Sequence, residues 1–266
     1  IDGGEPQILD LEPGEALYTV ATDLTEELHN VVVSKRTESG EGDLQFKGLI
    51  LDPEAYLAEA PSEPTVRMEF YGDSITSGYS VDCVCDESIA EYKNHDETYA
   101  AITARTLDAE HHSISISGLG IVESWWDATI WDYYDGVTTS DHDWNFKDWP
   151  ADIIVINLGQ NDKWLGVGSE IRQAYAAFVL ALRARNPDAE VFLALGSMDA
   201  VAPGSPFPNY LMGAVNDLNT THGDAKVHGV LFPYNGSGSH PVAAEQAEMA
   251  TVLVKAIAAA RPDLMP

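Results

Sequence analysis

The stretch VRMEFYGDSIT, residues 66–76, joins an apolar-leaning run to a Gly-Asp turn and then to a serine. A buried strand that ends in a turn places the next side chain at the open edge of a sheet, where α/β proteins bind ligands. Ser74 is therefore the candidate nucleophile. A serine after such a turn is also a common helix N-cap, so this stretch alone leaves a purely structural role open.

Three further polar blocks follow along the chain. They are Ser117-Gly118, Gly159-Gln160-Asn161-Asp162 and His240-Pro241. Taken with Ser74 and in this order, the blocks resemble those of the SGNH (GDSL-type) hydrolases, a superfamily named after its Ser, Gly, Asn and His. The resemblance implies an α/β fold, a three-layer αβα parallel sheet of flavodoxin-like type.

Strand and helix patterns alternate along residues 65–266. Strands are expected near 66–71, 112–117, 152–158, 190–196 and 226–233, and helices near 97–108, 169–185, 207–221 and 242–260. The helix at 169–185 has apolar residues at helical spacing, with Ser169 as its expected N-cap and Pro187 just beyond its end. Alternation of this kind predicts a parallel sheet with helices on both faces, and ligands at the carboxyl ends of its strands.

Residues 1–60 differ from the rest. Three β-rich runs, at 16–21, 29–36 and 45–51, are separated by acidic and glycine-rich turns. They predict a small β-strand module, followed by a linker at 61–64 and a hydrolase domain at 65–266. Because three strands bury little apolar surface by themselves, we expect the module to pack against the hydrolase domain or to form a homo-oligomer through its strands.

The chain has 266 residues and a formal net charge of −29, from 43 acidic and 14 basic residues. Such a surface repels phosphate backbones and anionic lipids, so neither nucleic acid nor a membrane is an expected partner. The sequence contains no apolar run of transmembrane length and opens without a leader. We expect a secreted or periplasmic protein whose leader is absent from this chain, with the cytoplasm as the alternative.

Two cysteines, Cys83 and Cys85, are separated by one residue. The spacing is too close for an easy bridge, so they are expected to be small unpaired side chains in the loop after the nucleophile. The neighbouring Asp82, Asp86 and Glu87 form at best a weak cation cluster, and the histidines lack metal-ligand spacing. No metal and no cofactor is expected.

Acyl transfer requires a nucleophile and a base that takes its proton. On the SGNH resemblance, Ser74 attacks and His240 acts first as general base and then as general acid. The superfamily places an Asp three residues before this His, but residues 236–239 contain no carboxylate. Either a backbone carbonyl or an acid from elsewhere must hold Nδ1. We favour a Ser-His dyad, because removing the orienting acid weakens triads without abolishing them.

The reaction also needs donors aimed at the oxygen that becomes negative. The resemblance assigns this oxyanion hole to the backbone N–H groups of Ser74 and Gly118 and to the side-chain amide of Asn161. Gly120, in the same Ser-Gly-Leu-Gly run, is a rival to Gly118. Structural roles are assigned to the two flanking acids: Asp73, and Asp162 as a helix cap.

Three local features resemble carbohydrate esterase family 2, whose members are deacetylases with a small β-sandwich ahead of the hydrolase domain. They are the block at 70–79, the run at 117–122, and the segments at 35–38 and 46–49. The resemblance implies removal of O-acetyl groups from the sugar hydroxyls of polysaccharides. It is incomplete in two respects, because the front module is shorter than a full sandwich and Ser239 stands where the family often has an aromatic residue.

Residues 123–150 form an irregular insertion rich in tryptophan, tyrosine and aspartate. Sugar C–H faces stack on aromatic rings while sugar hydroxyls bind carboxylates. Trp125 and Trp126 in the insertion, and Trp164 outside it, are therefore candidate substrate-binding residues. Packing of the same rings against the core is the structural alternative.

Two other functions stay open at this point. One is a general short-chain carboxylesterase with the same mechanism and no sugar preference. The other is a non-enzyme, a carbohydrate-binding module on a decayed esterase fold, which the missing Asp supports. A lipase and a metal-dependent deacetylase fit less well, because the sequence shows neither an exposed apolar helix nor a His-x-x-x-His pattern.

Overall fold

The computed structural model describes residues 1–139, 141 and 143–265. The chain divides into two compact units, which are considered separately. The first comprises Ile1–Ser34 and Phe46–Ser62, and the second comprises Lys35–Gln45 and Glu63–Pro266. The segment 35–45, which the sequence suggested was part of the front module, thus belongs to the unit that carries the sheet.

The first unit contains no helix or strand, and each of its residues is described. The three runs predicted as strands are irregular here. Apolar side chains within them, such as Leu17, Val32 and Ile50, are exposed, so burial does not favour pairing of the runs. Local bonds hold the unit, including those that Asp2 accepts from His29 Nδ1 and from Asn30 N, both at 2.7 Å. A β module ending at residue 60, and a homo-oligomer formed through it, stay predictions.

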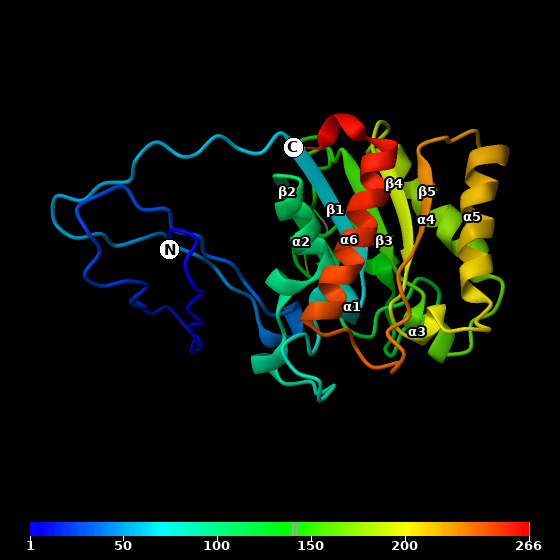
Figure 1. The fold of residues 1–266 in the computed structure, drawn as a ribbon, viewed down its shortest axis with the longest axis horizontal. Coiled ribbons are helices and arrows are strands. Elements are labelled where there is room, and N and C mark those ends of the chain that lie inside the picture. Colours follow the sequence, from blue (N-terminus) through cyan, green and yellow to red (C-terminus); the bar gives the residue numbers. More distant parts are fainter. Residues whose placement is uncertain (140, 142, 266) are drawn as a thin grey trace. The chain divides into compact units, whose positions relative to one another are not determined.

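The second unit is built on a five-stranded sheet (Figure 1). Its strands are β1 (Val66–Gly72), β2 (Ala109–Ser115), β3 (Ile153–Asn157), β4 (Glu190–Leu195) and β5 (Val227–Leu231). They lie in the order β2-β1-β3-β4-β5, and every neighbouring pair is parallel. Only β2 starts well away from its predicted position, three residues early. It is a half-buried edge strand, and its sequence AEHHSIS lacks the apolar run that marks a buried strand.

Helices cover both faces of this sheet (Figure 1). They are α1 (Ser74–Ser77), α2 (Tyr99–Thr106), α3 (Gln160–Trp164), α4 (Ile171–Arg185), α5 (Phe207–Thr221) and α6 (Ala243–Ala260). Apolar residues of α4 and α5 form one core with the sheet, and those of α2 and α6 form a second core on the opposite face. The three-layer αβα fold predicted from the sequence is confirmed.

The helix α4 begins slightly later than expected. Its N-cap is Glu170 and not Ser169, and the cap carries no side-chain hydrogen bond. The apolar stripe is as predicted, with Ile171, Tyr175, Phe178, Val179 and Leu182 all buried. The packing face therefore determines the position of this helix more than its cap does.

The strand order reverses at β1, because the chain passes from β1 outward to β2 and returns on the other side to β3. The ends of these strands are in register: Gly72 of β1 lies opposite Ser115 of β2 and Asn157 of β3. Open α/β sheets bind ligands in the crevice outside the strand ends at such a reversal. The loops after β1, β2 and β3 therefore converge on one place.

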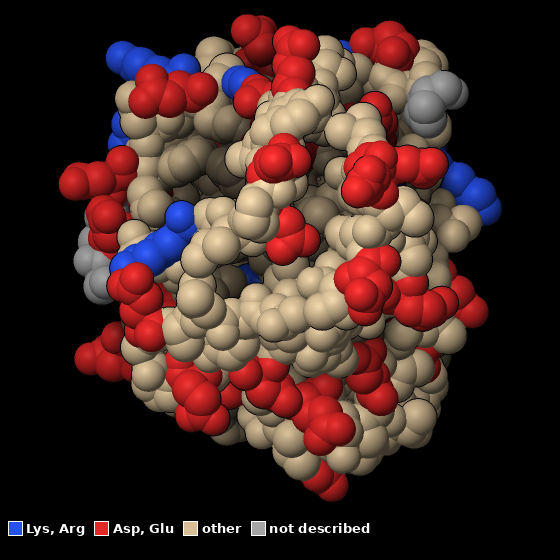
Figure 2. All heavy atoms as spheres, turned by 90° about the vertical axis from the view of Figure 1, so that its left-hand side faces the viewer, with Lys and Arg blue, Asp and Glu red and all other residues tan. Residues whose placement is uncertain are grey.

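Acidic side chains are spread over the face drawn in Figure 2, with a smaller number of basic ones between them. This distribution fits a solvated acidic shell. Among the described residues, none of the helices is both long and apolar enough to span a bilayer.

Candidate active site

Ser74 lies at the start of α1, directly after the turn that ends β1. The turn is tight: a Cβ at Gly72 would come within 2.0 Å of Thr76 Oγ1, so glycine is required there. Asp73 is the N-cap, and its Oδ1 accepts a hydrogen bond from Ile75 N at 3.0 Å. The structural role predicted for Asp73 is confirmed. Ser74 is thereby the first residue of a helix, with its hydroxyl at the carboxyl end of the sheet.

His240 lies within hydrogen-bond distance of Ser74. It comes from the loop between β5 and α6, and its Nε2 is 2.7 Å from Ser74 Oγ. Its Nδ1 is 2.5 Å from Asp86 Oδ1. A carboxylate on Nδ1 fixes the tautomer in which Nδ1 carries the proton, which leaves Nε2 free to accept the serine proton.

Asp86 changes the expectation of a Ser-His dyad. The sequence left open an acid from elsewhere, and the structure supplies one that lies 154 residues before the histidine. Asp86 follows the nucleophile helix by nine residues and does not occupy the position three residues before His240. The three side chains form a continuous Ser-His-Asp arrangement.

Burial lowers the pKa of His240 below its ordinary 6.5, and the neighbouring Asp86 carboxylate opposes this shift. Because burial has the larger effect, the pKa of His240 is lowered and its neutral ring is favoured near pH 7. A neutral imidazole is the form that can accept the proton of Ser74. The ring also lies against Tyr79, with centroids 4.2 Å apart, which restricts its rotation.

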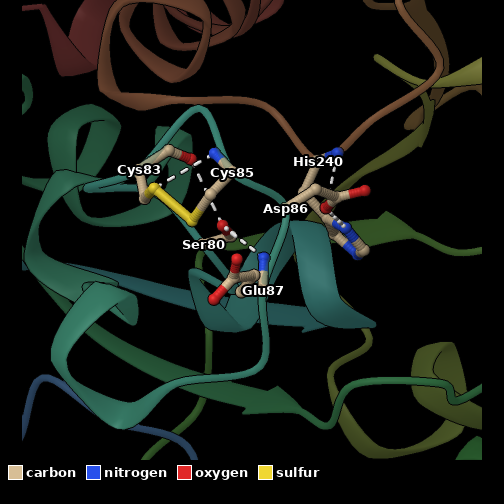
Figure 3. The surroundings of a disulfide bond; sticks show 6 residues. All are labelled: Ser80, Cys83, Cys85, Asp86, Glu87 and His240. Carbon is tan, nitrogen blue, oxygen red and sulfur yellow. Dashed lines mark hydrogen bonds and ion pairs between the residues drawn. A yellow bond between two sulfur atoms is a disulfide. The ribbon is translucent and has the colours of Figure 1, made fainter.

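Cys83 and Cys85 form a disulfide, which corrects the expectation that they are unpaired. Their Cα atoms are 5.2 Å apart, within the ordinary range for a bridge, because the loop around them turns sharply. Asp86 follows the second cysteine directly (Figure 3).

Two of the predicted oxyanion donors are backbone groups. The N–H groups of Ser74 and Gly118 donate to no partner among the described residues, so both are free for a substrate oxygen. Gly118 has a φ of 84°, and a Cβ there would come within 2.5 Å of the Trp126 ring. The N–H of the rival Gly120 is already bonded to Ser124 Oγ at 2.9 Å. The geometry therefore favours Gly118.

Asn161 follows Gln160, the first residue of α3. Its Oδ1 accepts a hydrogen bond from Trp125 Nε1 at 2.9 Å, which fixes which end of the amide is the donor. Its Nδ2 donates to Leu119 O at 2.8 Å and lies 3.3 Å from Asp73 Oδ2. The second contact is long, so this N–H can turn toward a stronger acceptor such as an oxyanion.

Asp162 is structural, although not as the helix cap that was expected. Its carboxylate accepts hydrogen bonds from the N–H groups of Ile121, Val122 and Glu123, at 3.0, 2.7 and 3.0 Å. These three residues lie at the start of the tryptophan-rich insertion. Asp162 therefore anchors the base of the insertion beside Gly118.

Sequence reasoning missed Glu38. This side chain is buried, accepts hydrogen bonds from Ser117 N and Ser117 Oγ at 2.8 Å each, and pairs with Lys93 at 2.8 Å. Burial raises the pKa of Glu38, but the bonds from Lys93 and Ser117 outweigh it and the pKa lies below its usual value. Glu38 thus holds the residue before Gly118. Its only sequence signal was its place in the segment 35–38.

The aromatic candidates lie in different surroundings. Trp126 covers Gly118, and it also lines a surface hollow formed by residues of 122–132 together with the carboxylates of Glu123, Asp127 and Asp132. Trp125 lies beside the same glycine and contacts Asn161 through its indole nitrogen. Trp164 ends α3 and is partly exposed. Only Trp125 and Trp126 are placed beside the oxyanion donors.

No group of three or more His, Cys, Asp or Glu that could hold a metal ion occurs within residues 1–139, 141 and 143–265. The site is therefore described by its side chains alone. They include a serine hydroxyl bonded to a histidine, a carboxylate bonded to the same histidine, and converging N–H donors, which are the kinds of group that acyl transfer requires.

Comparison with known proteins places this arrangement in a family. Residues 70–260 match the model of the GDSL-like Lipase/Acylhydrolase family, and residues 1–61 match the model named Carbohydrate esterase 2 N-terminal. The cellulase/esterase CelE of Acetivibrio thermocellus is 31% identical over 97% of this chain, and an acetylxylan esterase / glucomannan deacetylase of Cellvibrio japonicus is 27% identical over 92%. The chain spans about a third of the first relative and 73% of the second.

Solved structures agree. A family two carbohydrate esterase from Clostridium thermocellum in complex with cellohexaose superposes with a TM-score of 0.72 at 32% identity, covering 77% of this chain and 67% of that one. A family 2 enzyme of Corynascus thermopiles gives a TM-score of 0.71 at 28% identity, covering 79% and 70%. The chain belongs to the GDSL-like lipase/acylhydrolase family and, within it, to carbohydrate esterase family 2.

Proposed function

We propose that the protein is a serine esterase that removes O-acetyl groups from carbohydrates. The observation that supports this most directly is the 2.7 Å hydrogen bond between Ser74 Oγ and His240 Nε2 beside the free N–H groups of Ser74 and Gly118. A nucleophile, a base and donors for the developing negative charge meet at one point.

The reaction follows from this geometry. Ser74 Oγ attacks the acetyl carbonyl carbon while His240 Nε2 takes its proton. The carbonyl oxygen becomes negative and accepts hydrogen bonds from Ser74 N, Gly118 N and Asn161 Nδ2. His240 then returns the proton to the leaving sugar oxygen, and an acetyl-enzyme remains. Water, deprotonated by His240, attacks the acetyl-enzyme and releases acetate.

The substrate class is supported by the relatives and by the surroundings of the hole. The named relatives include acetylxylan esterase / glucomannan deacetylase, and one family structure holds cellohexaose. Beside Gly118, Trp126 offers a ring for a sugar C–H face, and the carboxylates of Glu123, Asp127 and Asp132 can accept bonds from sugar hydroxyls. These features favour a sugar ester over an unselective short-chain ester.

The proposal includes a location outside the cytoplasm, secreted or periplasmic. The Cys83–Cys85 disulfide supports it, because disulfides persist in oxidising compartments.

Replacement of the nucleophile tests the mechanism. We expect Ser74→Ala to lower kcat/KM on acetylated xylo-oligosaccharides and on p-nitrophenyl acetate by at least about 10⁴-fold, since subtilisin loses about 2 × 10⁶ in kcat when its serine is removed. Ser169→Ala, at an exposed serine next to the N-cap of α4, is the matched control and should keep full activity. A Ser74→Ala protein that still releases acetate would end the proposal.

Substrate comparison tests the sugar preference. The protein should give a higher kcat/KM on acetylated oligosaccharides than on p-nitrophenyl butyrate, and the substitution Trp126→Ala should lower only the former. Equal losses on both substrates would instead favour a general short-chain carboxylesterase.

A further inference from the structure

We propose that Asp86 is a positioning residue for His240, and that the Cys83–Cys85 disulfide holds the loop that delivers it. This inference deepens the proposed function and rests on it. It differs from the SGNH arrangement that the sequence resembles, in which the acid stands three residues before the histidine. Here the acid comes from the loop after the nucleophile helix.

One carboxylate oxygen makes both contacts between Asp86 and His240. Asp86 Oδ1 lies 2.5 Å from His240 Nδ1 and accepts a second hydrogen bond from His240 N at 3.3 Å (Figure 3). The first contact sets the tautomer and the second ties the carboxylate to the backbone that carries the ring. Together they hold Nε2 toward Ser74, which lies 2.7 Å away.

The loop that carries Asp86 is anchored at its first residue, where Arg36 and Asn94 bond the carboxylate of Asp82, but it has few contacts beyond that point. Residues 82–89 form no helix or strand and are largely exposed, and Asp86 adopts a left-handed φ of 56°. Aspartate tolerates this conformation better than most residues do, but the loop must still be held in it. The exposed side chain of Asp86 cannot depend on packing for its position.

Beyond the anchor at Asp82, two further links hold residues 83–87. Ser80 is buried beneath it, and its Oγ donates to Cys83 O at 3.2 Å and accepts from Glu87 N at 3.3 Å, so it joins the two sides of the loop. The disulfide closes a small ring across Val84 and ends immediately before Asp86 (Figure 3). Both hydrogen bonds of Ser80 are long, so the covalent link is the stronger constraint on residues 83–85.

The disulfide is open to reagents. Cys85 is exposed and Val84, between the cysteines, is 89% exposed. The sequence contains no other cysteine, so a reductant acts on this bond alone. A dithiol such as dithiothreitol supplies two electrons and two protons: the S–S bond breaks, two thiols form, and the reagent closes to its own cyclic disulfide.

Removal of the carboxylate is the first test. We expect Asp86→Asn to lower kcat by about a hundredfold, less than the roughly 10⁴-fold loss for the buried acid of a serine protease, because Asp86 is partly solvated. The matched control is Glu87→Gln, which removes a charge one position after Asp86. Glu87 bonds Ser80 through its backbone N–H, which the substitution keeps, and it does not bond His240. Glu87→Gln should keep kcat within about twofold, a change as small as is usual for an exposed surface position.

The pH profile separates positioning from a general loss of structure. The charged groups near His240 are Asp86 and Glu38, which favour its protonated form, and Lys93, which pairs with Glu38. Removing Asp86 leaves the protonated ring less stable, so the acid limb of kcat/KM should move to lower pH. Partial unfolding would lower the amount of active enzyme without moving that limb.

Opening the disulfide is the second test. Reduction by dithiothreitol, or the double substitution Cys83→Ser with Cys85→Ser, should lower kcat/KM by about tenfold, a loss that corresponds to the entropy of one freed backbone residue. The unfolding temperature should fall by no more than about 5 °C, because the closed ring is so small. In an Asp86→Asn background the same reduction should have almost no further effect, since the loop then has no carboxylate to deliver.

The outcomes are distinct. An active wild-type enzyme whose kcat and pH profile are unchanged in Asp86→Asn would overturn the positioning role and leave the esterase intact. An equal loss on reduction in both backgrounds would show that the disulfide acts by another route. An inactive wild-type enzyme, by contrast, would refute the proposed function itself.

Discussion

The two sides of His240 are built in different ways. On one side, Ser74 is buried at the end of a central strand, with Asp73 as its cap and Asn161 and Gly118 at the ends of neighbouring strands. On the other side, Asp86 lies in an exposed loop held by Ser80 and a disulfide. The difference teaches that the proposed bond-forming groups are fixed by the sheet, whereas the group proposed to orient the base is held by local links, one of which a reductant can open.

After that of Ser74→Ala, the largest expected effect lies on the sheet side. Asn161→Ala removes one proposed oxyanion donor and should lower kcat by about 10² to 10³-fold, with little change in KM. Asn219→Ala, at an exposed position of α5, is the control and should match the wild type. Steady-state kinetics on an acetylated oligosaccharide measures both. A loss smaller than that of Asp86→Asn would reverse the ranking of the two sides.

The sheet side should also contribute to the pH dependence of stability. Burial raises the pKa of Glu69 in β1 and of Asp73 at its end, each to about 7. Groups with raised folded-state pKa values contribute stability that is complete below about pH 4 and is lost as the pH rises through 7. These two carboxyl groups should therefore contribute more to the free energy of unfolding at pH 5 than at pH 8, whereas His95, His111 and His112, whose pKa values burial lowers, act in the opposite direction.

Glu69→Gln makes this prediction specific. Gln has no charge to bury and can still accept the hydroxyl of Tyr71, which lies 2.9 Å from Glu69 Oε2. Urea unfolding at pH 5 and pH 8 should show the difference between the two values reduced by about 2 kcal/mol. Glu87→Gln, in the exposed loop, should leave the difference as it is in the wild type. An unchanged profile in Glu69→Gln would contradict the prediction.

A smaller effect is expected from the contact that orients Asn161. Trp125→Phe keeps an aromatic ring but removes the Nε1–H that donates to Asn161 Oδ1. The amide can then turn its oxygen toward the oxyanion, and kcat should fall by about tenfold, the equivalent of about one hydrogen bond. Trp131→Phe, whose ring packs on Phe178, is the control. If kcat is retained and KM rises, Trp125 binds the sugar and does not orient the side-chain amide of Asn161.

The smallest effect is expected from Glu38, which acts through Ser117. Glu38→Gln keeps an oxygen for Ser117 N, but Ser117 Oγ must then accept from the amide NH2, and the charge that pairs with Lys93 is lost. We expect kcat to fall by about threefold, a fraction of one hydrogen bond. Glu41→Gln removes the other carboxylate that binds Lys93 and does not contact Ser117. Equal losses in the two variants would assign the effect to Lys93.

The sequence was informative wherever a strand preceded the functional residue. Ser74, Gly118 and Asn161 were predicted because the blocks that contain them resemble those of the SGNH hydrolases and follow predicted strands, and parallel strands bring their ends together. Asp86 was missed because neither periodicity nor spacing links an exposed loop to a histidine 154 residues away. Its neighbours Cys83 and Cys85 were the available signal, and they were interpreted as unpaired.

Residues 1–60 are a second region whose structure the sequence did not predict. Alternating β-rich runs predicted strands there, but strand formation depends on a partner that buries one face, and the sequence of a run does not specify that partner. The segment 35–45, which was predicted to lie in the front module, groups with the sheet unit for a related reason. Its role depends on Glu38 reaching Ser117 and Lys93, which are remote in the sequence.

The anchoring of residues 121–123 by Asp162 bears on how new specificities can be built on this scaffold. The carboxylate ties the start of the insertion to α3, whereas Ile130 and Phe146 farther along it are buried and must be kept. A library of substitutions at exposed positions of the insertion, such as Asp127, would therefore sample different polymers without disturbing the core.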